Sequence, residues 1–576
     1  MGTLLVFYPS TYAVHGYRFP VGPDAPVYIW WARLAGHEGL SAIPGLRPGV
    51  PALTLVVGGA LGLGPVAAVA ALEIALALAT ALAAVALTVD RGRKTWVATS
   101  AFTGLWAVHL ALGYVATLAA ATFLVAAAAA VTHRSRSAVI AAALLLGAAG
   151  LSHPQFFAIG VAILLATAIV ARVQGHGSEP VRIVKAVTGG LAITGVGLAA
   201  MLPGPPALDV DMSRDDVLER LGMLPTLRGL FRARLLERLW LYAPIVTVPL
   251  AIVGGRAASG FCGRLLRAWG LVLVATGVAA YATGLFPPER LVTFGFVIPI
   301  ATALGVVVLW HRARGKVRPL VAALAVAFAL PAVLAWEQTP PKIWPLQVER
   351  TTEAGRYASA SPPGTRLVFI ANGRQPIASF FATEAANAIR AAVPPDRIRD
   401  VRVVVTELAA QSEENRRVAE MLGEQAEAGL TPEQPVLRFD LGPFDRMSFG
   451  ETPGARFVAD GVAIIGDHPQ PAPAPVDPLE PSSPAGIAAA TLGVLALLAA
   501  AGFGWARWAL VSGLPAVALA PAFGAATLML AGLAIDRMGM RLDGWIGPAL
   551  AVGVVGLSGY LAVRRVAGSG SGGTRP

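Results

Sequence analysis

The sequence predicts a mainly α-helical fold, a polytopic transmembrane bundle of about 13 spans with a small extracytoplasmic α/β domain inserted before the last three helices. Of its 576 residues, 55% are hydrophobic and only 14% are charged, whereas a soluble domain is about 25% charged. The mean hydropathy is +0.64. The apolar residues form long runs separated by short basic segments, which is typical of a chain that crosses the membrane repeatedly.

The candidate spans are apolar runs of about 17–25 residues, the length at which a helix crosses a bilayer. The segment 51–63 is also apolar, but Gly64 and Pro65 separate it from the next run, so we expect a short helix in the membrane interface. Residues 1–8 are too few to span, so they either begin the chain at the outer face or are half of a longer first helix. The expected spans are 65–88, 95–111, 114–132, 137–151, 155–172, 183–203, 239–255, 265–285, 291–310, 317–336, 485–505, 510–534 and 545–563.

Basic residues orient these spans. They concentrate in every second loop, while the short loops of the opposite side hold only Arg290, Arg537 and Arg541. Cytoplasmic loops are rich in Lys and Arg, so the C-terminus is expected in the cytoplasm of a multi-pass cell-membrane protein. Three segments are then expected outside the cytoplasm: 16–50, 204–238 and 337–484.

The same distribution of charge excludes nucleic acid as a partner. The net charge is +11, but the basic residues lie between apolar spans and form no stripe with interleaved aromatics. The single cysteine, Cys262, excludes an intramolecular disulfide and a cysteine-based metal cluster. Membrane lipids are the partners that this composition predicts, and the oligomeric state is left open.

Residues 337–484 differ in composition from the rest, because Pro, Glu and Arg rise and no run is long enough to span. The β-α-β-α-β order of the pattern favours a small parallel α/β domain. The domain lacks a Gly-rich phosphate loop after its first strand, which favours an accessory role such as acceptor binding. The expected strands are 365–371, 399–405, 435–439 and 461–466, and the expected helices are 377–392 and 412–427.

The spans and the change in composition predict that the chain has four parts. Pro-rich residues at 469–484 tether the α/β domain back to the membrane, and Gly and Ser dominate the end of the chain. The expected parts are a transmembrane domain at 1–336 with outward loops 16–50 and 204–238, the α/β domain and tether at 337–484, C-terminal transmembrane helices at 485–565, and a disordered tail at 566–576.

Asp24 is the first candidate for chemistry. It lies in a Gly/Pro turn of the N-terminal outward loop, just before an aromatic stretch that includes Tyr28, a candidate for substrate binding. A carboxylate at the outer interface can deprotonate an acceptor hydroxyl or hold a metal ion beside a phosphate. The structural alternative is a helix N-cap, a position that favours Asp.

The segment that follows Asp24, Trp30-Trp31-Ala32-Arg33, and the outward stretch 286–294 around Glu289 and Arg290 resemble parts of the GT-C superfamily of integral-membrane glycosyltransferases. The resemblance covers roughly residues 10–336 and implies transfer of a hexose or pentose from a polyprenyl-phosphate donor to an extracytoplasmic acceptor, in envelope glycan or glycoprotein assembly. It implies that Asp24 is the functional acidic residue of the first outward loop, which acts as a base or a metal ligand. It also implies that Arg290 meets the lipid phosphate. No second acid adjoins Asp24, unlike in members with paired acids.

Further polar residues are candidates for substrate binding, each with a structural alternative. His153 is either a donor to phosphate or sugar or a turn residue between two apolar helices, and Glu289 with Arg290 is either a phosphate contact or an interface pair. Asp209 and Asp211 belong to a solvated loop or supply a second acid above the site. Glu73 lies within the first full span, where an acid is a functional candidate, and His109 is its expected partner.

Three classes of function remain open from the sequence. Glycosyl transfer is the leading hypothesis, with no certain cofactor and a divalent metal ion as an open alternative. A lipid-linked substrate transporter or flippase would usually show internal repeats, and the sequence has none at a fixed period. The third class is a non-catalytic membrane scaffold with an outward binding domain.

Overall fold

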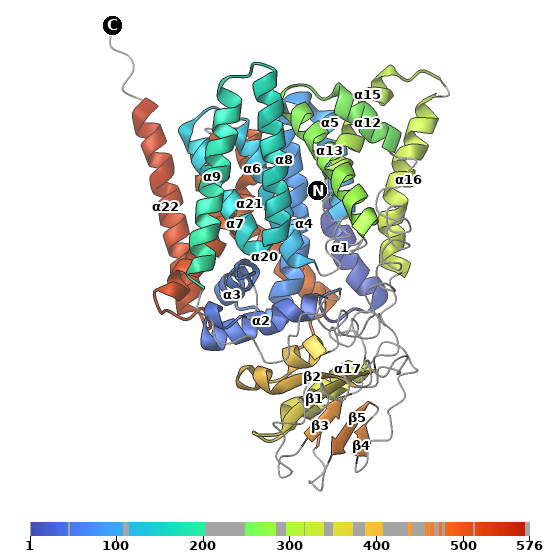
Figure 1. The fold of residues 1–576 in the computed structure, drawn as a ribbon, viewed down its shortest axis with the longest axis vertical. Coiled ribbons are helices and arrows are strands. Elements are labelled where there is room, and N and C mark those ends of the chain that lie inside the picture. The colour runs from blue at the N-terminus through green and yellow to red at the C-terminus, as the bar shows by residue number, and fades with distance from the viewer. Residues whose placement is uncertain are drawn as a thin grey trace.

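The structure is a computed structural model. Its described residues are 2–22, 24–43, 46–107, 114–201, 248–283, 295, 297–315, 317–338, 349–372, 386–406, 436–439, 455–459, 461–465, 472–474, 479–510 and 513–570. Helices dominate this part of the chain, as the sequence predicts (Figure 1).

Seven helices of the described residues are long and apolar enough to cross a membrane, so the chain has the character of a helical membrane protein. A total of 13 spans stays a prediction. The seven helices are α4 (Pro65–Leu87), α8 (Pro154–Val173), α9 (Ser178–Ala199), α13 (Gly260–Thr283), α20 (Pro484–Leu510), α21 (Leu514–Arg537) and α22 (Ile546–Gly570). The other helices of the bundle are α1 (Gly2–His15), α2 (Ala25–Glu38), η1 (Leu40–Ala42), α3 (Gly49–Leu61), η2 (Val89–Arg91), α5 (Arg93–Ala107), α6 (Val115–Val131), α7 (Arg136–Ser152), α12 (Val248–Ala257), α15 (Ile298–Arg312) and α16 (Val317–Gln338).

The bundle has a central layer and a periphery. The most apolar windows of α4 and α21 are 89% and 83% buried, whereas those of α9, α13 and α22 are each 28% buried. The helix α4 is rich in Ala, and α20 and α21 contain both Ala and Gly. Small residues let helices approach closely in membranes. At Gly502 of α20, an added Cβ would lie 1.9 Å from the carbonyl oxygen of Ala520 in α21. The peripheral helices expose Val and Leu, as lipid-facing helices do.

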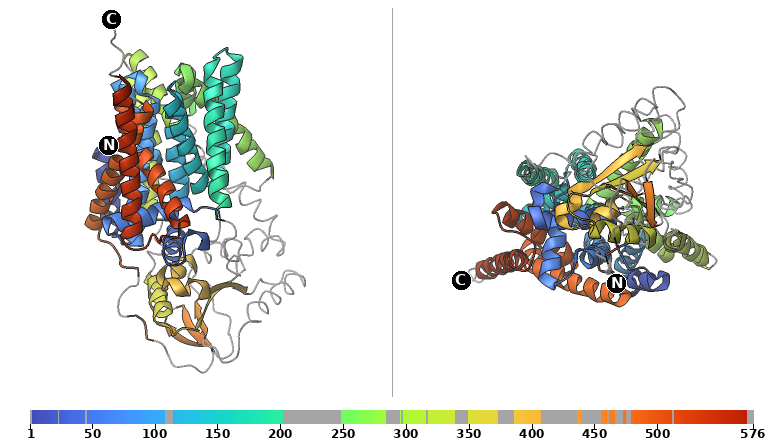
Figure 2. Two further views of the ribbon diagram at one scale, coloured as in Figure 1. Left: turned by 90° about the vertical axis from the view of Figure 1, so that its left-hand side faces the viewer. Right: turned by 90° about the horizontal axis from the view of Figure 1, so that it is seen from below.

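Two short helices lie across one end of the bundle. Figure 1 shows α2 running across this end and α3 nearly end-on, while the longer helices stand upright. The position of α3 matches the short helix expected at 51–63. Both views of the fold place α2 between the bundle and the α/β domain (Figures 1 and 2).

The α/β domain contains a five-stranded sheet in the order β2-β1-β3-β5-β4. The strands β1, β2 and β3 are parallel, but β5 pairs antiparallel with both β3 and β4. The prediction of a parallel sheet was therefore wrong for its second half, because the β4–β5 connection is too short for a crossover and forms a hairpin. The strands are β1 (Arg366–Asn372), β2 (Val401–Thr406), β3 (Val436–Phe439), β4 (Ala455–Ala459) and β5 (Val462–Ile465).

Helices complete this domain. The sequence pattern did not predict α17 (Glu349–Ala360), nor η6 (Pro395–Asp400) and β4. The predicted helix 377–392 is described only from residue 386 onward, and residues 386–392 are helical. The predicted helix 412–427 lies outside the described residues.

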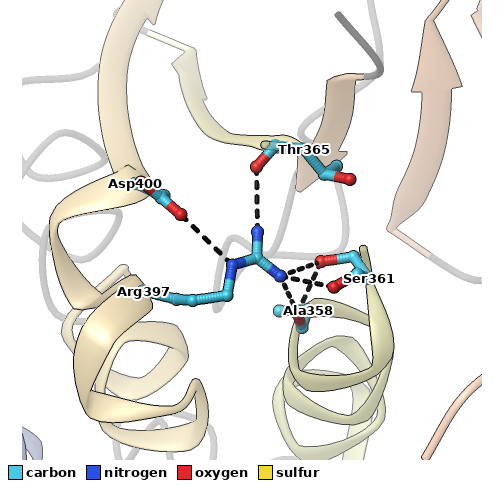
Figure 3. Close-up of polar contacts among 5 residues, drawn as sticks. All are labelled: Ala358, Ser361, Thr365, Arg397 and Asp400. Carbon is cyan, nitrogen blue, oxygen red and sulfur yellow. Dashed lines mark hydrogen bonds and ion pairs between the residues drawn. The ribbon is translucent and has the colours of Figure 1, made fainter. Parts of the chain in front are cut away.

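A buried arginine ties the helical layer to the sheet (Figure 3). The Arg397 guanidinium donates to the Thr365 carbonyl at 2.9 Å and to the carbonyl and hydroxyl oxygens of Ser361 at 2.6 and 2.7 Å. It also reaches the Ala358 carbonyl at 3.4 Å and pairs with Asp400 at 3.1 Å. The last carbonyls of a helix have no partner within it, so Arg397 satisfies the end of α17 and fixes it beside β1 and η6.

Candidate functional site

Asp24 is positioned by the start of α2. It occupies the cap position, and a proline in the first turn suits the beginning of a helix. Its side chain accepts no capping hydrogen bond from the first turn of α2, which is described in full. The Asp24 carboxylate instead interacts electrostatically with Glu73 and with the Tyr28 hydroxyl. The geometry therefore does not support the capping alternative.

Glu73 is the second candidate acid. It is distant from Asp24 in the sequence but interacts with it electrostatically in the fold. It lies in α4, about 12 Å along the helix from Pro65 at 1.5 Å per residue, and its side chain is 1% exposed. Within the described residues neither carboxylate oxygen of Glu73 has a hydrogen-bond partner. Asp24 and the Tyr12 hydroxyl are its electrostatic neighbours. The expected partner, His109, lies outside the described residues.

Tyr28 links the site to a basic residue that the sequence analysis missed. Its hydroxyl forms hydrogen bonds with the Arg47 side chain and with the backbone of Ala116, in the first turn of α6. Burial raises the pKa of Tyr28 to about 12, a shift that Asp24 reinforces and Arg47 opposes. Tyr28 is therefore a neutral phenol at physiological pH, and it holds Arg47 at the same end of the bundle as Asp24.

His153 lies in the turn between α7 and α8, where its ring caps α8. Its Nδ1 accepts a hydrogen bond from the Phe156 backbone N–H at 3.2 Å, and the side chain is 6% exposed. The turn lies against the start of α3, since a Cβ added at Gly49 would approach the Leu151 carbonyl oxygen to 3.0 Å. Arg47 precedes Gly49 by two residues, so the turn and Arg47 are close. A contact of His153 with phosphate or sugar would have to use Nε2.

Three helices begin near Arg47, namely α3, α6 and α8. The N-terminus of a helix carries partial positive charge and unpaired N–H groups. Together with the Arg47 guanidinium, these helix starts make this end of the bundle favourable for an anionic group. A signal for Arg47 was present in the sequence, because it stands in the segment 16–50 that is expected to face outward, directly before the expected interfacial helix.

Four predicted site residues fall outside the described residues, namely Asp209, Asp211, Glu289 and Arg290. The predicted convergence of Asp24 with Arg290 therefore stays a prediction. Among the described residues, no group of three or more His, Cys, Asp and Glu side chains could hold a metal ion. Asp24 and Glu73 supply two carboxylates, which are the ligand type that Mg²⁺ prefers.

No family model matches this chain, and no curated protein matches it. The site is thus defined by its own geometry: two carboxylates, a phenol and a guanidinium at one end of a helical bundle.

Proposed function

We propose that the chain is a membrane glycosyltransferase that moves a sugar from a polyprenyl-phosphate donor to an acceptor outside the cytoplasm. The observation that carries the proposal is the Asp24 carboxylate, which makes no capping bond to its helix and interacts electrostatically with the buried acid Glu73. The basic loops support an orientation with this end of the bundle, and residues 337–484, outside the cytoplasm.

In the proposed reaction, the oxygen of an acceptor hydroxyl attacks the anomeric carbon of the donor sugar. The bond between that carbon and the phosphate oxygen breaks, and the lipid phosphate leaves with the bonding electrons. Asp24 takes the hydroxyl proton as general base. Arg47, held by Tyr28, balances charge on the phosphate, a role that suits a guanidinium.

Glu73 has a supporting part in this proposal. Two carboxylates that interact electrostatically, as Asp24 and Glu73 do, disfavour a state in which both are charged. The pair can therefore keep the acceptor proton at the site after Asp24 has removed it. The same two carboxylates would be the ligands of a divalent cation, if the reaction uses one.

Transport of a lipid-linked substrate is the second candidate, and Glu73 is the observation that favours it. Acids buried within membrane helices occur in proton-coupled transporters. A transporter would move the labelled lipid between leaflets without cleaving it, whereas the transferase releases the sugar from the lipid.

The test uses the purified protein in lipid vesicles with a radiolabelled polyprenyl-phosphate sugar and a mixture of hydroxyl acceptors. We expect the wild type to transfer label to an acceptor and Asp24→Asn to lose this activity. Asp543→Asn is the matched control, because Asp543 is exposed beyond the end of α21, near α2 at Gly36. Equal turnover by the wild type and Asp24→Asn would refute the proposal.

A further inference from the structure

The α/β domain contacts α2, the helix that begins directly after Asp24. The Trp30 indole N–H donates to the Asn387 side-chain oxygen at 3.1 Å, and the Arg390 guanidinium lies 5.5 Å from the Trp30 ring centroid. Arg33 donates to the backbone carbonyl of Ala391. We call Trp30, Arg33, Asn387 and Arg390 the α2 joint. Trp30 is 2% exposed, Asn387 7% and Arg390 2%, so the joint is a packed interface.

The tether that leaves the α/β domain adds contacts on both sides of Asp24. The Ser482 backbone N–H donates to the Arg18 carbonyl at 3.0 Å, in the loop that leads to Asp24. Glu480 interacts electrostatically with Arg33 on α2. Glu480 has a φ of +46°, a conformation that non-glycine residues rarely adopt, so the surrounding contacts hold this turn in place.

The far end of α2 is fixed to the bundle. The Leu40 backbone N–H, just beyond α2, lies 3.2 Å from each carboxylate oxygen of Asp536 at the end of α21. The bundle thus anchors one end of α2, and the α/β domain holds its middle. Trp30 lies six residues after Asp24, about 9 Å along the helix, so a shift at the joint moves the Asp24 end directly.

We propose that the α/β domain is a positioning element for the reaction, which acts through the α2 joint to set the Asp24 carboxylate beside Glu73. Asn387 and Trp30 are the positioning residues. This inference rests on the proposed function for its kinetic consequence, but the position of Asp24 can be measured without any activity. Positioning matters because a displacement of about 1 Å at a reacting group can lower a rate on the order of 100-fold.

The first measurement follows the position of residue 24 by thiol chemistry. The chain has one cysteine, so Asp24→Cys in a Cys262→Ala background gives a single thiol for reaction with a maleimide. Asn387→Leu removes the acceptor of the Trp30 N–H while keeping a side chain of similar size. We expect the loosened α2 to raise the rate at which this thiol is modified about fivefold, as expected for the loss of one buried hydrogen bond.

Two variants control this measurement. Asn387→Asp keeps an acceptor oxygen for Trp30 and should restore the slow modification rate. Tyr357→Phe removes a hydroxyl that donates to the Val458 carbonyl at 3.3 Å within the α/β domain, and it should leave the rate unchanged. An unchanged rate in folded Asn387→Leu would overturn the inference, as would an equal rise in Tyr357→Phe.

The second measurement is kinetic and uses the chain without the cysteine changes. We expect Asn387→Leu to lower kcat about tenfold with little change in KM for the polyprenyl-phosphate sugar, since positioning affects the reacting atoms more than binding. A higher KM at constant kcat would make the joint a binding element and refute a positioning role. If the wild type transfers no sugar, the proposed function fails, while the thiol measurement still tests the joint.

Discussion

Two glutamates of the helical bundle, one partly buried and one fully buried, have opposite surroundings. Glu179 of α9 meets Arg264 of α13 in a bidentate pair, with distances of 2.9 Å from Nε to Oε1 and 2.5 Å between the second nitrogen and Oε2. Glu73 of α4 is more deeply buried, yet neither of its oxygens has a hydrogen-bond partner among the described residues. One acid is fully paired and the other faces a second acid, Asp24.

The difference separates an acid with a structural partner from an acid for which we propose a function. A buried charge is costly unless it is paired and hydrogen-bonded. The Glu179–Arg264 pair meets this condition and joins α9 to α13, which is a structural role. The surroundings of Glu73 offer no such compensation within the described residues. An acid buried in this way within a membrane helix is a candidate for a functional residue that binds a proton, a ligand or a cation.

The largest effect expected is on activity, at the site that Asp24 and Glu73 form. Asp24→Asn should lower the rate of sugar transfer on the order of 10²–10⁴-fold, the usual contribution of a general base. Loss of a helix cap should not contribute to any change in stability, because the Asp24 side chain makes no capping bond to α2. The check is the transfer assay together with thermal unfolding in detergent. A loss of folding with the loss of activity would give Asp24 the structural role that Glu179 has.

The Glu179–Arg264 pair should respond in the opposite way. Arg264→Met leaves the partly buried Glu179 without its partner and should destabilise the protein by about 1–3 kcal/mol. Adding Glu179→Met should recover most of this loss, since an apolar pair can replace a buried ion pair. Thermal unfolding of the two variants in detergent measures both effects. If the double variant is no more stable than Arg264→Met, the two residues do not act as a pair.

Glu73→Gln should show a smaller effect on activity and none of the instability. The amide keeps the size and polarity of the buried side chain but cannot ionise, so the variant should be about as stable as the wild type. Transfer should fall about tenfold if the carboxylate shares the proton that Asp24 removes. The transfer assay and an unfolding curve of the same preparation check this. Marked destabilisation would indicate that Glu73 is paired through residues that the structure does not describe.

The sequence predicts the bundle well and the site only in part. Apolar runs bounded by Pro, Gly and charged residues locate the helices, and the span expected at 65–88 corresponds to Pro65–Leu87. Asp24 was found because its turn and the aromatic residues after it are local features. Its approach to Glu73 depends on how α2 packs against α4, and periodicity carries no information about that.

The same limit applies to the contacts of the α/β domain. The hydrogen bond between Trp30 and Asn387 joins residues 357 positions apart, which a single sequence cannot indicate. The strand β4 is five residues long and lacks the longer alternation on which strand prediction depends. Local signals therefore locate the elements, while the second acid, Arg47 and the α2 joint arise from packing.

The smallest effect concerns Tyr28, which is well paired although it lies at the site. At neutral pH, Tyr28→Phe should cost about 0.5–1.5 kcal/mol through loss of the hydroxyl's hydrogen bonds. The wild type should lose this difference in the free energy of unfolding when the pH is raised. Since the folded-state pKa of Tyr28 is raised from 10.0 to about 12, the unfolded chain releases the proton first, and stability falls as pH rises from about 10 to 12.

Tyr28→Phe lacks this ionisation, so the two unfolding curves should converge and cross in that pH range. A shift of two units corresponds to about 2–3 kcal/mol, which exceeds the hydrogen-bond contribution at neutral pH. Denaturant unfolding in detergent at several pH values measures the difference between the wild type and the variant. A difference that stays constant up to pH 12 would mean that the phenol is exposed to water and does not hold Arg47 in the folded protein.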